Sequence, residues 1–192
     1  MKPKRLWWVV RSFFISGARR RALYAKKAHI YAHVGDKVKI GTLHIPIYSE
    51  LISIGNNVII SRNVDFVTHD VINGMLNRLP EEERKGYKFK EHIGCIEILD
   101  NVYIGSNSVI LYGTRIGPNV IIASGSVVTK DCEPNSVYAG CPARRIESLE
   151  DYIAKRIDQE SSGVLTTTTH NQALTPEEVE EAWKQFRLKH QK

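Results

Sequence analysis

The sequence predicts a parallel β-helix, an all-β solenoid of short strands and corners, with α-helices at its N- and C-terminal ends. Between Ile98 and Pro134 an aliphatic residue recurs every six residues. An α-helix cannot use this period, because six residues rotate a helical face away from its starting direction. Stacked strands can use it, because each unit supplies one strand and one corner. The aliphatic residues are therefore expected to form a continuous buried column.

The fourth position of these units indicates where the corners lie. Asn, Gly or Asp stands there, as in Asn101, Gly113 and Asn119. These residue types tolerate the positive φ that a sharp corner requires. We therefore expect left-handed backbone conformations at this position in successive turns.

The repeat extends back to Val34, which gives a coil domain over residues 31–146, and it is interrupted twice. Ile40 and Ile54 are separated by two residues more than a multiple of six, so part of residues 43–50 is expected to bulge from a corner. Residues 71–93 lack the repeat and are rich in charge, which predicts a loop leaving the coil. Long loops on rigid scaffolds often carry function, although a tolerated surface insertion is the alternative.

The segments on either side of the coil are predicted to be helical. Residues 1–30 form a basic amphipathic segment, and residues 147–192 form C-terminal helices joined by a flexible link. The first of these helices is expected over Ile146 to Gln159, and the link over 161–163 and 166–169. The second begins at Thr175-Pro176-Glu177-Glu178, where Thr175 caps and Glu178 completes a capping box.

Positive charge is concentrated at the front of the chain. The formal net charge is +6, and no Asp or Glu precedes Asp36. The Trp, Val and Phe residues of this segment either lie on an anionic membrane surface or pack on the coil end or a neighbouring subunit. Nucleic acid is not an expected partner, because no helix-turn-helix, finger or single-strand-binding signature is present.

The localisation expected from the sequence is cytoplasmic, with the inner face of the membrane as a peripheral site. No apolar run is long enough to span a bilayer. Arg11 interrupts the first apolar run and no small-residue cleavage site follows, so we expect the segment to be retained. Cys95, Cys132 and Cys141 are odd in number and lack metal-ligand spacing, which suits a reducing compartment.

Several segments together resemble the hexapeptide-repeat acyltransferases, and most closely the maltose, galactoside and capsular-polysaccharide O-acetyltransferases. They are Ile104–Asn107, Ile116–Ile121, Ala123–Asp131 and Pro134–Arg144. The resemblance implies a left-handed β-helix, a homotrimer with active sites between subunits, acetyl-coenzyme A as acyl donor and no metal. It also implies a carbohydrate hydroxyl as acceptor, which we expect to enter beside the loop over residues 71–92.

The resemblance also implies a catalytic base at His69. In the resembling enzymes a His follows a hexapeptide strand just before a loop, and Thr68-His69-Asp70 matches that position. A sugar hydroxyl is a weak nucleophile, and an imidazole can take its proton during attack on a thioester. Asp70 or a backbone carbonyl would orient the ring. The alternative is that His69 only ends a strand.

The resemblance also implies contacts with the acetyl-coenzyme A donor, residue by residue. Ser106 matches a position near the thioester, Ser124 a position on the pantetheine arm, and Thr129 and Lys130 the next contact along that arm. Arg144, with Arg145 beside it, matches a position at the nucleotide phosphates, which suits a guanidinium. In the alternative interpretation the serines are small because corners are tight, and the cations are solvated surface.

The sequence departs from the resembling sugar O-acetyltransferases in one early loop. Those enzymes carry an Asn there that steadies the tetrahedral intermediate, and residues 41–50 contain no Asn. A backbone N–H, Ser49 or Tyr48 would have to supply that hydrogen bond.

Other functions stay open at the sequence level. An amino-sugar or xenobiotic acceptor would keep acetyl transfer but change the acceptor. A zinc enzyme of the γ-carbonic anhydrase type would use His69 and His92, although Glu97 stands where a closely spaced second His would be expected. A coil that only organises partners would bind no donor.

Overall fold

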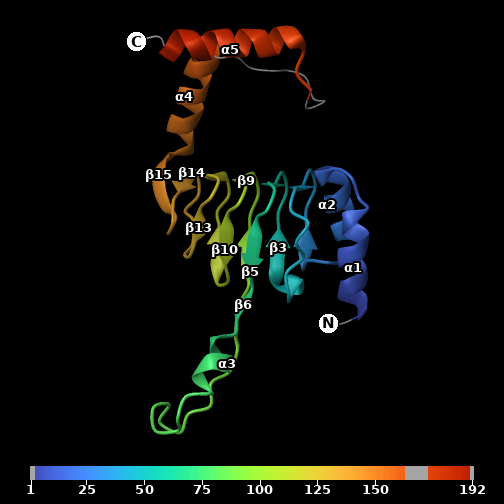
Figure 1. The fold of residues 1–192 in the computed structure, drawn as a ribbon, viewed down its shortest axis with the longest axis vertical. Coiled ribbons are helices and arrows are strands. Elements are labelled where there is room, and N and C mark those ends of the chain that lie inside the picture. The colour runs from blue at the N-terminus through green and yellow to red at the C-terminus, as the bar shows by residue number, and fades with distance from the viewer. Residues whose placement is uncertain (1–2, 163–172, 191–192) are drawn as a thin grey trace. The chain divides into compact units, whose positions relative to one another are not determined.

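The computed structural model describes residues 3–162 and 173–190 and divides into two compact units, Met1–Leu149 and Glu150–Lys192. In the first unit, helices α1 (Pro3–Phe13) and α2 (Ala18–Lys27) precede a coil of short strands (Figure 1). The coil strands are β1 (His33–Val34), β2 (Lys39–Ile40), β3 (Ile52–Ile54), β4 (Ile59–Ile60), β5 (Asp65–Val67), β8 (Ile96–Ile98), β9 (Val102–Ile104), β10 (Val109–Leu111), β11 (Thr114–Ile116), β12 (Val120–Ile122), β13 (Val127–Val128) and β14 (Ser136–Ala139).

The described coil strands form three parallel sheets. Their orders are β1-β3-β8-β11, β2-β4-β9-β12-β14 and β5-β10-β13. Successive strands of the chain fall in successive sheets, so that β8, β9 and β10 make one complete turn and β11, β12 and β13 the next. The chain therefore winds as a parallel β-helix with three faces, as the six-residue period predicts.

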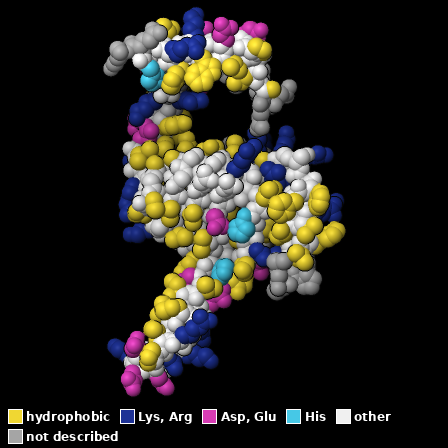
Figure 2. All heavy atoms as spheres, viewed as in Figure 1, with side chains coloured by type: hydrophobic (Ala, Val, Ile, Leu, Met, Phe, Trp, Pro, Cys, Tyr) yellow, Lys and Arg dark blue, Asp and Glu magenta, His cyan; other side chains and the backbone are white. Residues whose placement is uncertain are grey.

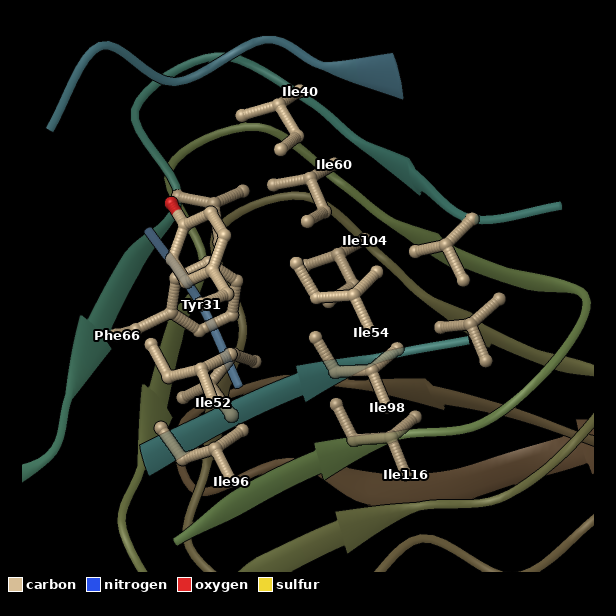
Figure 3. Packing of buried hydrophobic residues seen from close by; sticks show 14 of the residues in the cluster. Tyr31, Ile40, Ile52, Ile54, Ile60, Phe66, Ile96, Ile98, Ile104 and Ile116 are labelled. Carbon is tan, nitrogen blue, oxygen red and sulfur yellow. The ribbon is translucent and has the colours of Figure 1, made fainter. Parts of the chain in front are cut away.

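The aliphatic residues of the repeat form the interior of this coil. Ile54, Ile98 and Ile116 are paired across neighbouring strands, and each is at most 1 % exposed. Ile60 and Ile104 form a second stack on the next sheet (Figure 3). Because strand residues alternate between faces, the intervening side chains point outward.

The corners have the predicted left-handed conformation. Asn57, Asn101, Asn119 and Asn135 have φ of 53°, 59°, 59° and 55°. Their side chains lie one above another, and each amide donates to the oxygen of the next at 2.9, 2.8 and 2.8 Å. This ladder satisfies polar groups that would otherwise be left at a tight corner.

The two interruptions of the repeat lie where the sequence predicts them. After β2, residues 41–48 and the short 3₁₀-helix η1 (Ser49–Leu51) lead directly to β3. This turn contributes no strand to the β5-β10-β13 sheet, and buried Ile45 fills the interior there. The second interruption projects from the coil on an antiparallel stem of β6 (His69–Asp70) and β7 (His92–Ile93), and it carries α3 (Ile72–Leu76).

The C-terminal boundary differs from the prediction. The helix expected from Ile146 begins at Leu149, as α4 (Leu149–Ser161), because β15 (Arg144–Ser148) pairs antiparallel with β14. Ser161, predicted in the link, is the last residue of α4, and residues 163–172 of that link lie outside the described part.

The second unit contains the predicted capping box. Helix α5 (Pro176–His190) begins after Thr175, whose N–H donates to Glu178 at 2.8 Å, while the Glu178 N–H donates to Thr175 Oγ1 at 3.2 Å. Among the described residues, no helix combines the length and apolar character that crossing a bilayer requires.

Candidate active site

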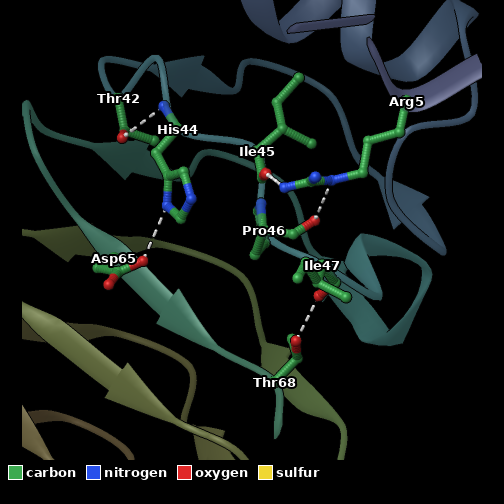
Figure 4. A network of polar contacts seen from close by, with 8 residues as sticks. All are labelled: Arg5, Thr42, His44, Ile45, Pro46, Ile47, Asp65 and Thr68. Atoms are coloured by element: carbon green, nitrogen blue, oxygen red, sulfur yellow. Dashed lines mark hydrogen bonds and ion pairs between the residues drawn. The ribbon is translucent and has the colours of Figure 1, made fainter. Parts of the chain in front are cut away.

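The candidate base, His69, lies where the chain leaves the coil. Thr68 is fully buried and its hydroxyl donates to the Ile47 carbonyl, which ties residues 41–48 to this point (Figure 4). Gly94 donates its N–H to the Thr68 carbonyl at 3.0 Å, so the returning strand is fixed here as well. Phe66 and Thr68 point inward, and strand alternation turns Asp65, Val67 and His69 to the outer surface.

The His69 ring lies between an aromatic ring and a carboxylate. Its side chain is 22 % exposed, and Nε2 is 3.9 Å from Glu91 Oε1. The Tyr48 ring meets the imidazole edge-on, with centroids 5.3 Å apart. Nδ1 is buried and has no hydrogen-bond partner among the described residues. A half-buried imidazole with a carboxylate facing one nitrogen is an arrangement that can take up and return a proton.

Asp70 lies beside His69 in the chain but binds elsewhere. Its Oδ2 accepts a hydrogen bond from the Tyr112 hydroxyl at 2.6 Å, and its Oδ1 accepts the Ile72 N–H at 3.2 Å. The bond from Tyr112 is the main cause that lowers the pKa of Asp70, and it raises the pKa of Tyr112. In the described chain no hydrogen bond joins Asp70 to the His69 ring. The carboxylate beside that ring is Glu91, which the sequence analysis did not single out.

The Glu91 carboxylate also affects the pKa of Tyr48. The negative charge of Glu91 is the largest cause that raises the pKa of Tyr48, followed by burial and a hydrogen bond to the same carboxylate. The phenol is therefore held in its protonated, hydrogen-donating form. Ser49, the other side chain predicted as an oxyanion donor, is 1 % exposed.

The residues predicted to contact the donor are distributed over different parts of the coil. Ser106 and Ser124 stack at one corner, where Gly125 donates its N–H to the Ser106 carbonyl at 2.8 Å. Thr129 and Lys130 lie at the following corner, after β13, and Arg144 opens β15. One chain therefore brings the two serines together and places Arg144, which pairs with Ala139, near the same corner. Strand β13 separates the serines from Thr129 and Lys130.

A second polar cluster, which the sequence did not indicate, lines a cavity of about 590 Å³. Its walls are Arg21, Gly41, Thr42, Leu43, His44, Arg62, Asn63, Val64 and Asp65. His44 Nδ1 lies 2.9 Å from Asp65 Oδ1 (Figure 4). The Arg21 guanidinium donates to the carbonyls of Ile40 and Ile15, so it connects α2 to the coil.

Within residues 3–162 and 173–190, no group of three or more His, Cys, Asp or Glu side chains lies close enough to hold a metal ion.

Part of the coil matches a known protein family. Residues 96–130 match the family model described as bacterial transferase hexapeptide, six repeats. This segment of the chain is similar to the hexapeptide-repeat transferases. The matched segment covers β8 to β13, two of the three described turns that place a strand in every sheet of the coil.

Sequence relatives of this chain include named acetyltransferases. Galactoside O-acetyltransferase of Escherichia coli K12 is 36 % identical over 129 residues, which are 64 % of this chain and 59 % of the relative. Protein CapG of Staphylococcus aureus is 43 % identical over 108 residues, 56 % of this chain and 59 % of CapG. The chain thus spans about three fifths of the length of these two relatives.

A solved structure agrees with the fold. A galactoside acetyltransferase in complex with coenzyme A superimposes with a TM-score of 0.53 at 28 % identity, covering 79 % of this chain and 83 % of that one. The strand order of the coil and the solved structure therefore agree on the fold.

Proposed function

We propose that this protein transfers an acetyl group from acetyl-coenzyme A to a hydroxyl group of a carbohydrate, with His69 as general base. The observation that carries the proposal is the His69 ring, partly buried at the root of the 71–93 excursion between Tyr48 and Glu91. The names of the relatives, a galactoside O-acetyltransferase among them, support acetyl transfer to a sugar.

The proposed reaction is a direct transfer. The acceptor hydroxyl gives its proton to His69 as its oxygen attacks the thioester carbonyl, forming a tetrahedral intermediate. Collapse of the intermediate breaks the carbon–sulfur bond, and the imidazolium returns the proton to the departing thiolate. The products are an acetyl ester and coenzyme A. Alignment of the two substrates supplies much of the rate in such a ternary complex.

No cysteine is needed as a nucleophile. Burial raises the pKa of Cys132 to about 12, which keeps this sulfur as an unreactive thiol. Cys95 and Cys141 are exposed, free cysteines with no base adjacent in sequence.

Within this proposal Glu91, and not Asp70, is the carboxylate beside the His69 ring, with its Oε1 3.9 Å from Nε2. Because Nδ1 is buried, Nε2 is the nitrogen that takes the acceptor proton, and the charge of Glu91 stabilises the imidazolium that forms. Asp70 instead supports the stem of the excursion through Tyr112. Tyr48 is the side chain we assign to the oxyanion, because its ring contacts the His69 ring at a centroid distance of 5.3 Å while Ser49 is buried. Loss of one such donor typically lowers turnover by about 10²–10³-fold.

The donor contacts support sites formed between copies of the chain. The donor would have to contact the corner of Ser106 and Ser124 and also Thr129 and Lys130, which lie beyond β13 in the same coil. One coil does not line a single groove with all four residues. We therefore propose a homotrimer of left-handed coils with the donor bound between subunits.

The outer surfaces of the sheets favour such an assembly. On the β5-β10-β13 sheet four of the outward, partly exposed side chains are apolar, namely Val67, Val109, Leu111 and Val127, and Asp65, which pairs with His44, is the charged one. On the β1-β3-β8-β11 sheet they include Ser53 and the ion pair of Glu97 with Arg115. An apolar face is the one expected to be covered by another copy. Sedimentation at several protein concentrations tests the trimer directly.

Calorimetric titration with acetyl-coenzyme A tests the donor, with Lys130→Ala/Arg144→Ala as the paired variant. Micromolar binding that weakens in this variant supports the proposal, and absence of binding at millimolar donor overturns it. Thiol release with a panel of carbohydrates then tests the base. His69→Ala should abolish turnover while donor binding persists, whereas His33→Ala, an exposed His at the start of β1, should leave both unchanged.

The same assays distinguish the proposed function from the alternatives. An amino-sugar or xenobiotic acceptor would give an amide, which resists the hydroxylamine treatment that cleaves an acetyl ester. A zinc enzyme or a coil that only organises partners would show no donor binding, and stoichiometric zinc in untagged protein would favour the former. The proposed setting is the cytoplasm, where acetyl-coenzyme A is available as donor.

A further inference from the structure

Helix α1 has apolar side chains on two faces. Trp8 and Val9 pack against the core, and Ser12 between them and the coil is buried. The opposite face remains uncovered, with Leu6, Trp7, Val10, Phe13 and the adjoining Phe14 exposed. Residues at this spacing share one side of a helix. We call this uncovered set the α1 stripe.

The α1 stripe is a continuous surface. Trp7, Phe13 and Phe14 are 61 %, 64 % and 84 % exposed. Trp7, Val10, Arg11 and Phe14 enclose a groove of about 250 Å³. Figure 2 shows hydrophobic side chains gathered where α1 lies in Figure 1, with Lys and Arg side chains at the margin. Single exposed apolar residues are ordinary on a protein surface, but a contiguous stripe marks a contact surface.

The basic residues around this stripe divide into two groups. Some hold the fold together: Arg5 donates to the Ile45 carbonyl at 2.7 Å, and Lys26 pairs with Asp36 at 2.7 Å. Others are exposed on α2. In the described part of the chain, the side chains of Arg19, Arg20 and Lys27 form no hydrogen bond or ion pair.

Every charged residue of α1 and α2 is basic. No acidic residue precedes Asp36 in the sequence, and Asp36 is itself paired with Lys26. A surface that complements this region must therefore offer apolar groups to Trp7 and Phe14 and negative charge to Arg19 and Arg20. The surface of an anionic lipid bilayer offers both, as hydrocarbon lies directly beneath phosphate groups.

We propose that the α1 stripe and the unpaired cations of α2 bind this protein to the surface of an anionic lipid bilayer. The helix lies along the interface with its Trp and Phe side chains among the acyl chains, and Arg19, Arg20 and Lys27 meet the headgroup phosphates. A protein partner, including another copy, is the competing occupant. The lipid is favoured because every charged residue of α1 and α2 is basic, so these two helices of one copy would repel the same helices of another.

Co-sedimentation of the full chain with vesicles tests the proposal. Partition onto mixed phosphatidylglycerol–phosphatidylcholine vesicles should exceed partition onto phosphatidylcholine alone by about tenfold, and should fall as salt screens the attraction. Trp7→Ser/Phe14→Ser should lower partition onto the mixed vesicles by about tenfold. Arg19→Gln/Arg20→Gln should remove most of the preference for the anionic vesicles.

The chain offers a matched control in its second unit. Trp183 and Phe186 on α5 are 56 % and 54 % exposed, so Trp183→Ser/Phe186→Ser removes the same kinds of exposed side chain. Partition should not change in this variant. Circular dichroism verifies that each variant is folded, and if Trp7→Ser/Phe14→Ser does not fold, the Arg19/Arg20 pair decides.

Three results would overturn the proposal. The first is equal partition onto both kinds of vesicle, or onto neither. The second is an equal loss of partition in the α5 control. The third is a change in oligomeric mass in Trp7→Ser/Phe14→Ser with partition unaltered, which would assign the α1 stripe to a protein contact. None of these results depends on acetyl transfer, so the two proposals can fail separately.

Discussion

Thr68→Val should weaken both the fold and the proposed catalysis, because one hydroxyl connects the Tyr48 segment to the strand that carries His69. Thr68 is fully buried and donates to the Ile47 carbonyl. Val has nearly the same shape but cannot donate, so the carbonyl of Ile47 is left without this partner. Leaving one buried polar group unsatisfied costs about 1–3 kcal/mol.

The magnitude can be followed in two assays. For a domain of this size, each kcal/mol corresponds to a fall in Tm of about 2–4 °C, compared at one protein concentration because an oligomer is concentration-dependent. The Tyr48 ring, 5.3 Å from the His69 ring, should also lose its fixed position. We expect a fall in kcat of about tenfold or more, because small displacements of positioned groups are costly in catalysis.

Thr114→Val is the matched control. Thr114 is 4 % exposed, and its hydroxyl donates to the Leu111 carbonyl at 2.7 Å, at a corner that carries none of the proposed catalytic side chains. It should lower Tm by a similar amount and leave kcat unchanged. Equal effects of the two variants on kcat, or an unchanged Tm in Thr68→Val, would refute this account of the Tyr48 segment.

Two further predictions concern the stem and a corner. The hydrogen bond from Tyr112 lowers the pKa of Asp70 in the folded protein. This hydrogen bond therefore stabilises the fold above the unfolded pKa of about 3.9, and the stabilisation is lost as pH falls through the lower folded pKa. The difference in Tm between wild type and Tyr112→Phe should shrink between pH 7 and pH 3. Gly105→Ala should lower the free energy of unfolding by about 1–3 kcal/mol, because its Cβ would collide with the Ser124 backbone nitrogen. Gly74→Ala in α3 meets nothing within 4 Å, and urea denaturation should show no loss there.

The repeating part of the fold could be predicted because the six-residue period of the sequence determines which residues stack in the core. Ile98 pairs with Ile116 because eighteen residues of chain, three units, return it to the same face. The corner positions followed from residue chemistry, as the φ of 59° at both Asn101 and Asn119 confirms. The predicted start of α4 was wrong, because the helical periodicity of the sequence continues back to Ile146. In the structure Ile146 belongs to β15, which pairs with β14.

The candidate site was less predictable for a geometric reason. His69 and Asp70 are consecutive residues of a strand, so their side chains point to opposite sides, and adjacency in sequence argues against a contact. Glu91 approaches His69 only because the stem pairs Asp70 with His92. That register depends on the whole excursion between them, which has no repeat from which it could be read. The pairing of His44 with Asp65 likewise depends on an irregular segment.

Strand β15 gives the coil an end. A stack of parallel strands exposes unpaired N–H and C=O groups at its last turn, and such edges invite other chains to add on without limit. Here the chain reverses and places an antiparallel strand against β14, while α1 and α2 occupy the opposite end beside β1 and β2. Arg144 begins that closing strand. A substitution that loosened it would disturb a proposed phosphate contact and also open the edge to polymerisation, so loss of donor binding and growth of fibres would appear together.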